Sequence, residues 1–126
     1  MTSGSLFSAD ETERLRRERV AAAHAAARLR RDWYGRAMVH AIEHAWASAS
    51  FTTDPVWAAL AFEQVPRPAD ERLMGNVMRE LMRLGAVVSS HTTRKSHRAE
   101  CHGRPVTVWK SLVVGTGPNT PAKPGG

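Results

Sequence analysis

Residues 51–88 have the sequence FTTDPVWAALAFEQVPRPADERLMGNVMRELMRLGAVV, which predicts two helices and a strand. The first helix is expected to be capped by Thr53, because the Asp-Pro pair that follows then lies in the first turn, where proline is tolerated. The two prolines of segment 65–68 end this helix. The second helix is expected over 69–84, where apolar residues recur at helical spacing, and Gly85 is its expected C-terminal stop.

The residues on either side complete the predicted domain. A helix is expected over about 32–49, with Asp32 as its N-cap. Beyond the second helix, residues 86–89 predict a short strand, and residues 105–109 alternate as a second strand that residues 112–114 can extend. The chain is therefore expected to be mostly α with a small β-hairpin, in the order of a winged helix-turn-helix. An α+β domain with no role in DNA binding could have the same order of elements.

The two ends of the chain differ from this central domain at 32–114. Residues 1–9 are small and polar and are expected to be disordered, as are the Gly/Pro-rich residues 115–126. Residues 10–31 are rich in Ala, Arg and Glu, with acids first and arginines last, which suits a helix. Because its apolar residues are mostly alanine, this helix is expected to project as an arm or to pair with another copy.

The net charge of the 126-residue chain is +6, and it is unevenly distributed. Residues 1–31 hold seven Arg and four acids (+3), residues 32–85 hold five Arg and seven acids (−2), and residues 86–126 hold six Lys/Arg and one acid (+5). Basic charge at both ends favours a polyanionic partner. The single cysteine and the lack of a signal-like or membrane-spanning apolar segment predict a cytoplasmic protein without a membrane partner.

The helix expected at 69–84 has one apolar and one basic face when it is projected at about 100° per residue. The face opposite the apolar one carries no acid and consists of Arg72, Gly75, Asn76, Arg79 and Arg83. Arginine can donate two hydrogen bonds to guanine and asparagine can pair with adenine, and either can hold a phosphate. This face is therefore a candidate recognition surface for DNA, although any surface helix also needs a solvated face.

The polar segment 91–104 between the two predicted strands is strongly basic and is a candidate wing. Its candidate DNA contacts are Arg94, Lys95, Ser96, Arg98, His102 and Arg104. Loops of this composition can lie along the phosphate backbone and the minor groove. The alternative is a solvated basic loop, but the position directly after the candidate recognition helix favours the wing.

The sequence offers weak support for a metal site or for catalysis. His91, His97, Cys101 and His102 suggest zinc, but no CxxC or HxxxH pair occurs among these four residues. No acid is evident that could orient a histidine beside Cys101, and no Walker loop, GxGxxG, HExxH or GxSxG motif is present. We therefore expect no enzyme activity, no cofactor and no small-molecule substrate.

Several strings of the chain, spanning about 33–112, resemble one known family. They are FTTD with Val-Trp at 51–57, LMGNVMR at 73–79, LGAV at 84–87, RKS at 94–96, and ECH followed by RPV and VW at 100–109. This chain resembles the small winged-helix DNA-binding proteins of actinobacterial phages and prophages. The resemblance implies a winged-helix fold and DNA binding through the helix at 69–84 and the wing.

Together these features predict a sequence-preferring protein that binds double-stranded DNA and acts as a phage or prophage factor in regulation or replication. Arg72, Asn76 and Arg79 are expected to enter the major groove. The alternative is a protein-interaction adaptor that docks or dimerises through the helix at 10–31, since a fold does not fix a function. RNA binding has less support, because the basic loop holds no aromatic platform for stacked bases.

Overall fold

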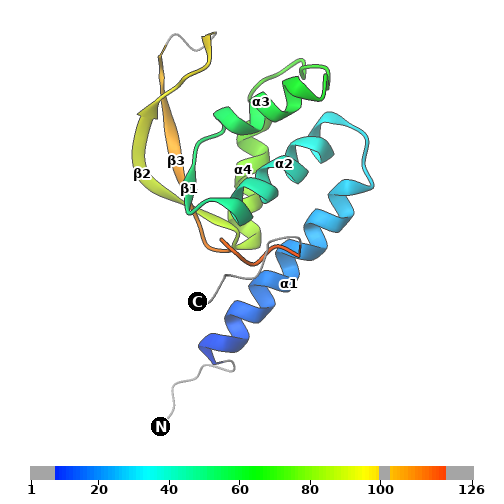
Figure 1. The fold of residues 1–126 in the computed structure, drawn as a ribbon, viewed down its shortest axis with the longest axis vertical. Helices are drawn as coiled ribbons and strands as arrows, with labels where there is room; N and C mark the ends of the chain where they lie inside the picture. The colour runs from blue at the N-terminus through cyan, green and yellow to red at the C-terminus, as the bar shows by residue number, and fades with distance from the viewer. Residues whose placement is uncertain (1–7, 100–102, 119–126) are drawn as a thin grey trace.

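The computed structural model describes residues 8–99 and 103–118. Within them the chain is an α+β fold with four helices and one three-stranded antiparallel sheet (Figure 1). The helices are α1 (Ala9–Arg28), α2 (Trp33–Ala47), α3 (Asp54–Phe62) and α4 (Leu73–Leu84), and the strands are β1 (Ser50–Phe51), β2 (Val87–Lys95) and β3 (Pro105–Ser111). No helix among the described residues is long and apolar enough to cross a membrane.

The predicted ends of the helices are partly confirmed. The Asp32 carboxylate caps α2 by accepting a hydrogen bond from the backbone N–H of Gly35, and Gly85 ends α4 in the left-handed conformation at φ 81°. Thr53 is the N-cap residue of α3, as expected, but its side chain makes no capping hydrogen bond. The hydroxyl of Thr52 instead accepts a hydrogen bond from the backbone N–H of Asp54, at 3.2 Å.

The second helix of the central pair begins later than the sequence predicts. Residues 69–72 do not belong to α4, which begins at Leu73. Asp70 holds the preceding turn, because its carboxylate accepts a hydrogen bond from the backbone N–H of Arg72 at 2.9 Å. With α3 ending at Phe62, ten residues (63–72) link the two helices. This link is longer than the three or four residues typical of a helix-turn-helix.

The core forms where α2, α3, α4 and the sheet meet. Ile42 of α2, Leu60 of α3 and Leu81 of α4 are almost completely buried in it. Alanines at 37, 41 and 45 are buried on α2, which lets neighbouring elements approach that helix closely. This packing fixes which face of α4 is turned to solvent.

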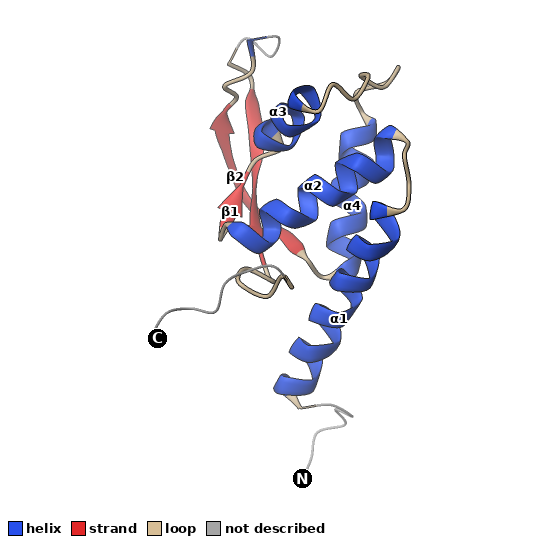
Figure 2. Ribbon diagram, turned by 45° about the vertical axis from the view of Figure 1, so that its right-hand side comes forward, coloured by secondary structure: helices blue, strands red, loops and turns tan. Residues whose placement is uncertain are grey.

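Helix α1 is not a free arm, which corrects part of the expectation for residues 10–31. Its C-terminal half packs on the domain, with Val20, His24 and Ala27 buried. The His24 ring lies 4.5 Å from the Trp46 ring, centroid to centroid, and its Nε2 is 3.0 Å from Glu43 Oε2 on α2. Only the N-terminal part of α1 projects beyond the domain (Figure 2). The alanines of α1 predicted a helix with little to bury, but their small side chains allow close contact between helices.

Helix α1 also supports the C-terminal end of α4. Arg19 Nε donates a hydrogen bond to the Leu84 carbonyl at 3.1 Å, and the Arg16 side chain lies against Gly85. The last carbonyls of a helix lack partners within it, and they carry partial negative charge. Arg19 therefore satisfies one of them with a cation from another helix.

We expect Arg19→Ala to lower the free energy of unfolding by about 0.5–1 kcal/mol, because the Leu84 carbonyl loses a charged donor. Urea unfolding followed by circular dichroism measures this change. Arg14→Ala is the matched control, because Arg14 is exposed on α1 and pairs with Glu18 in the same helix. Equal losses in the two variants would show that the contact with α4 contributes nothing.

The sheet has the strand order β1-β3-β2, and it differs from the predicted hairpin in two ways. The short strand β1 was not predicted, and its Ser50 pairs with Lys110 of β3. Strand β2 continues to Lys95, so the first part of the expected loop at 91–104 is strand. A bulge between Ser89 and Thr93 interrupts the ladder, with His91 in the left-handed region at φ 62°. The bulge bends β2 and raises its local twist.

The residues after β3 pack against α2, contrary to two expectations. Residues 112–114 do not extend the strand, and Val113 is buried in the core. Residues 115–118 were expected to be part of a disordered tail, but Gly115 donates a backbone hydrogen bond to the Trp46 carbonyl at 2.8 Å. Gly117 lies so close to the Trp46 ring that a Cβ there would be 2.6 Å from it. Residues 8 and 9 were also expected to be disordered, but Ser8 caps α1 and Ala9 is its first residue. Residues 1–7 and 119–126, the rest of the expected disordered ends, lie outside the described residues.

Candidate nucleic-acid interface

The basic face predicted for the second helix is exposed on α4. We call it the α4 strip, and it consists of Arg72, Gly75, Asn76, Arg79 and Arg83. The Arg72 side chain is 91% exposed and that of Arg83 is 69% exposed. The strip is exposed because Met74, Val77, Met78, Leu81 and Leu84 bury the opposite face of the helix. The helical periodicity therefore placed these residues correctly, although Arg72 lies just before the first turn.

Neighbouring acids partly neutralise the arginines of the α4 strip. Arg72 Nε is 3.1 Å from Asp70 Oδ1, and Arg83 pairs with Glu80. The hydrogen bond from Arg72 lowers the pKa of Asp70, and the one from Arg83 lowers the pKa of Glu80. Arg79 donates to the side-chain oxygen of Asn76. Exposed pairs of this kind contribute little to stability, so a phosphate or a base edge can replace the carboxylate.

The β2–β3 hairpin carries a second set of exposed cations. Arg94 and Lys95 are the last residues of β2, where they pair with Val106 and Pro105, and Arg104 directly precedes β3. The stem of Lys95 packs across Gly103, which has a positive φ of 74°. The outer end of the β2–β3 hairpin lies far from the N-terminus of α1 (Figure 1).

Ser96 does not face solvent, which corrects its prediction as a DNA contact. Its side chain is buried, and its hydroxyl lies 3.0 and 3.1 Å from the two carboxylate oxygens of Asp54. The backbone N–H of His97 donates to the same carboxylate at 2.8 Å. Ser96 therefore fastens the hairpin to the first turn of α3.

Arg98 is also held inside the structure, which corrects the second wing assignment. Its guanidinium lies 4.5 Å from the centre of the Trp57 ring and 3.8 Å from a Glu71 oxygen, and its side chain is only 14% exposed. Packing on the ring and pairing with Glu71 leave it poorly placed to reach a phosphate. His102, the remaining candidate of the wing, lies outside the described residues.

An open groove of about 360 Å³ separates α4 from strand β3. Met74, Gly75 and Met78 line it on one side, and residues 105–107 and Trp109 line it on the other. Thr53, Trp57, Glu71 and Arg98 complete its lining. Gly75 is the residue of the α4 strip that lines the groove, and the cations of the strip and of the hairpin lie outside the lining. The groove therefore separates α4 from β3, the elements beside which these cations are placed.

A third basic segment flanks α4 on the side away from the hairpin. The Tyr34 hydroxyl donates to the Asn76 carbonyl at 3.4 Å, and the Arg30 guanidinium lies 5.2 Å from the centre of the Tyr34 ring. Arg30 also pairs with Asp32. The turn that contains Arg28, Arg30 and Arg31 thus reaches the neighbourhood of the α4 strip. Sequence reasoning had assigned these arginines to a separate arm, because only tertiary packing brings them to α4.

The comparisons with known proteins give no indication of function, so a function must be argued from the surfaces of the molecule. No family model, curated protein or solved structure matches the chain. The resemblance to phage winged-helix proteins stays a prediction from the sequence.

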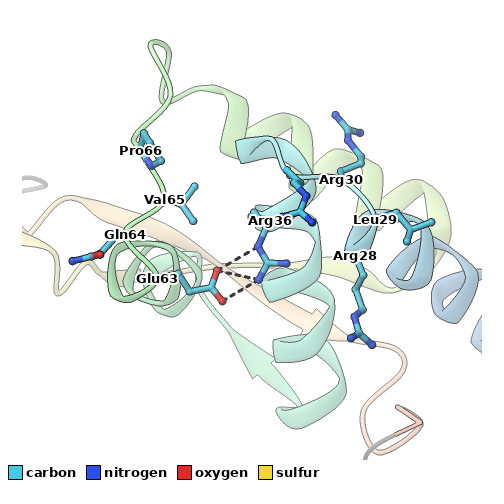
Figure 3. Close-up of a pocket in the computed structure, with 9 residues that line it drawn as sticks. Arg28, Leu29, Arg30, Arg36, Glu63, Gln64, Val65 and Pro66 are labelled. Atoms are coloured by element: carbon cyan, nitrogen blue, oxygen red, sulfur yellow. Dashed lines mark hydrogen bonds and ion pairs between the residues drawn. The ribbon is translucent and has the colours of Figure 1, made fainter.

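Another hollow lies between the α1–α2 turn and the segment after α3 (Figure 3). Its volume is about 620 Å³, and four arginines line it, namely Arg28, Arg30, Arg31 and Arg36. Figure 3 shows Arg28 and Arg30 pointing in different directions, while Arg36 turns to Glu63. Arg36 Nη2 donates to both carboxylate oxygens of Glu63 at 2.9–3.0 Å, so its charge is compensated.

The described residues contain no group of three or more His, Cys, Asp or Glu placed to bind a metal. Cys101 and His102, two of the four residues considered for zinc, lie outside them.

Proposed function

We propose that the protein binds double-stranded DNA as a winged helix-turn-helix. In this proposal α3 and α4 are the helix-turn-helix and the β2–β3 hairpin is the wing. The observation that carries it is that two exposed basic surfaces, the α4 strip and the hairpin cations, belong to elements that an open groove separates. Neither surface is needed for the core, and both have donors suited to nucleic acid.

The dimensions and donors of α4 suit the major groove. A helix of 12 residues is about 18 Å long, and the major groove is about 12 Å wide, wide enough for one helix. Arg72, Asn76 and Arg79 are assigned to base edges, where arginine and asparagine can each form two hydrogen bonds. Arg83 is assigned to the phosphate backbone.

The hairpin is assigned to the backbone and the adjacent minor groove. Its contacts are reduced to Arg94, Lys95 and Arg104, because Ser96 and Arg98 serve the structure. The bonds from Ser96 and His97 to Asp54 hold the base of the hairpin against α3. A wing fixed in this way loses little conformational entropy on binding.

The biological role proposed is that of a sequence-preferring factor in phage or prophage regulation or replication. It follows the resemblance of the wing and helix sequences to the actinobacterial phage proteins. The proposal assigns binding and no catalysis.

The test of the proposal is a titration of the full chain against a labelled random duplex and against single strands of the same length. We expect micromolar or tighter duplex binding at low salt, and weaker binding of the single strands. We expect this difference because the α4 strip is proposed to enter the major groove, which a single strand lacks, and because a duplex has a higher phosphate density. Absence of duplex binding at micromolar protein and low salt would contradict the proposal.

The hairpin cations make a separate prediction. We expect the triple change Arg94→Ala, Lys95→Ala and Arg104→Ala to weaken binding of all duplexes alike, because phosphate contacts carry no sequence information. The log–log salt slope should become shallower by about 3, or about 0.9 for each phosphate that the variant no longer neutralises. A panel of duplexes at several salt concentrations measures both effects. A changed ranking of the duplexes would instead assign the hairpin to base reading.

The adaptor alternative depends on α1, and the packing of that helix argues against part of it. A dimer formed through the face that holds Val20, His24 and Ala27 would have to displace α2 and α4. Docking on the exposed side of α1 remains the alternative proposal. Sedimentation of the full chain tests the dimer, and charge reversal at Arg72 and Arg79 that spares biological activity would favour an adaptor.

A further inference from the structure

Gly75 occupies a position on α4 that nothing within the described structure requires to be glycine. It is exposed in the first turn of α4, as the third residue of the helix, and its φ is negative, as in any helical residue. A Cβ built at this position would meet only one atom, Arg79 Nη1, at 3.9 Å, which is an ordinary contact with the end of a flexible side chain. Gly35 differs, because a Cβ there would lie 2.4 Å from Arg30 Cβ.

Glycine is costly at such a position. It loses more backbone entropy than alanine when it is fixed in a helical conformation, so an exposed glycine within a helix lowers stability. A residue that destabilises the helix and relieves no internal clash is best explained by something outside the chain that comes close to it. Gly75 also lines the groove between α4 and the hairpin, where an external group has room.

Duplex geometry indicates what that group is. The major and minor grooves of DNA are separated by a sugar–phosphate strand. If α4 enters a major groove and the hairpin lies over the adjacent minor groove, that strand must pass between them. The groove bounded by Gly75 on α4 and Thr107 on β3 is the place where it would pass.

We propose that Gly75 is the point of closest approach between α4 and the sugar–phosphate backbone of a DNA duplex. This inference rests on the proposed DNA binding and goes beyond it, because it assigns a DNA contact to a residue that has no side chain. The hydrogen of Gly75 leaves space for a deoxyribose and its phosphate. The end of the Arg79 side chain, which lies 3.9 Å from a Cβ built at Gly75, is free to turn toward the base edges assigned to it.

The experiment compares Gly75→Ala and Gly75→Leu with the wild type in two measurements, thermal unfolding and duplex affinity. We expect Gly75→Ala to raise the midpoint of unfolding by about 3 °C, because the helix loses its most flexible residue. Duplex affinity should fall with the size of the side chain, on the order of fivefold for alanine and fiftyfold or more for leucine, as extra carbon is forced into a packed contact. Ala25→Leu, at an exposed position of α1, is the control for added bulk and should leave affinity unchanged.

The outcomes separate this inference from the proposal on which it rests. Higher stability with graded loss of affinity supports it. Higher stability with unchanged affinity, in a wild-type protein that binds duplex, overturns the role of Gly75 and leaves DNA binding intact. Lower stability in Gly75→Ala would show that the glycine serves the fold and would also overturn it. A wild type that does not bind duplex overturns both.

Discussion

Replacing Arg72 and Arg79 together with alanine is expected to weaken duplex binding by about 30-fold or more, at about 1 kcal/mol or more for each arginine removed. Both side chains are exposed on the α4 strip and serve no part of the core. The free energy of unfolding should therefore change little, because exposed ion pairs contribute little to it. Fluorescence anisotropy with a labelled duplex measures the affinity, and chemical unfolding measures the stability.

The matched control is the double change Arg14→Ala and Arg17→Ala. It also removes two positive charges, from exposed positions of α1. The N-terminal part of this helix projects away from the domain (Figure 2). If general attraction between a basic protein and DNA dominates, the two double variants will lose affinity equally. Such a result would remove α4 from the interface, whereas a loss confined to Arg72 and Arg79 supports the assignment.

Asp54→Ala is expected to lower the free energy of unfolding by about 2–4 kcal/mol, the largest effect on stability that we predict. The carboxylate is 9% exposed and accepts hydrogen bonds from the Ser96 hydroxyl and the His97 backbone. Its loss leaves both donors without this acceptor in a buried region. The hairpin should also loosen, so duplex affinity should fall by about tenfold, through the added cost of ordering the wing on binding.

Ser96→Ala removes the hydrogen bond between Ser96 and Asp54 but keeps the charge of the Asp54 carboxylate. This variant removes one donor but leaves Asp54 bonded to the His97 backbone, so we expect it to cost only about 1 kcal/mol. In a double-mutant cycle, adding Ser96→Ala to Asp54→Ala should cost almost nothing more, because the two groups act as one unit. Additive losses would show that the two side chains are energetically independent and that Asp54 does not hold the hairpin through Ser96.

Local chemistry made much of this fold predictable. Helical spacing placed the apolar and basic faces of the second helix correctly, and the positive φ of Gly85 matches a glycine expected to stop that helix. The Asp32 cap was also predictable, since an Asp directly before an apolar helix has one common use. In each case residues within a few positions of one another determine the result.

Features that depend on residues far apart in the sequence were missed. Ser96 resembled a loop serine, and only the fold brings it to Asp54, 42 positions away. Arg98 was counted as a phosphate contact because sequence cannot show that Trp57 lies beneath it. The alanines of α1 suggested an arm with little to bury, yet small side chains are what allow a helix to pack closely. The outer half of β2 was not predicted to be strand, because its residues are polar and basic.

The salt dependence of duplex binding tests the central proposal most directly. Four cations assigned to phosphates face solvent, namely Arg83, Arg94, Lys95 and Arg104. Release of about 0.9 counterion for each neutralised phosphate predicts a slope of about −4 in a plot of log affinity against log salt concentration, if all four contact phosphates. A slope near this value, made shallower by about 3 in the Arg94→Ala/Lys95→Ala/Arg104→Ala variant and unchanged in the α1 control, is the result we predict. A slope shallower than about −2 would contradict the interface formed by α4 and the hairpin.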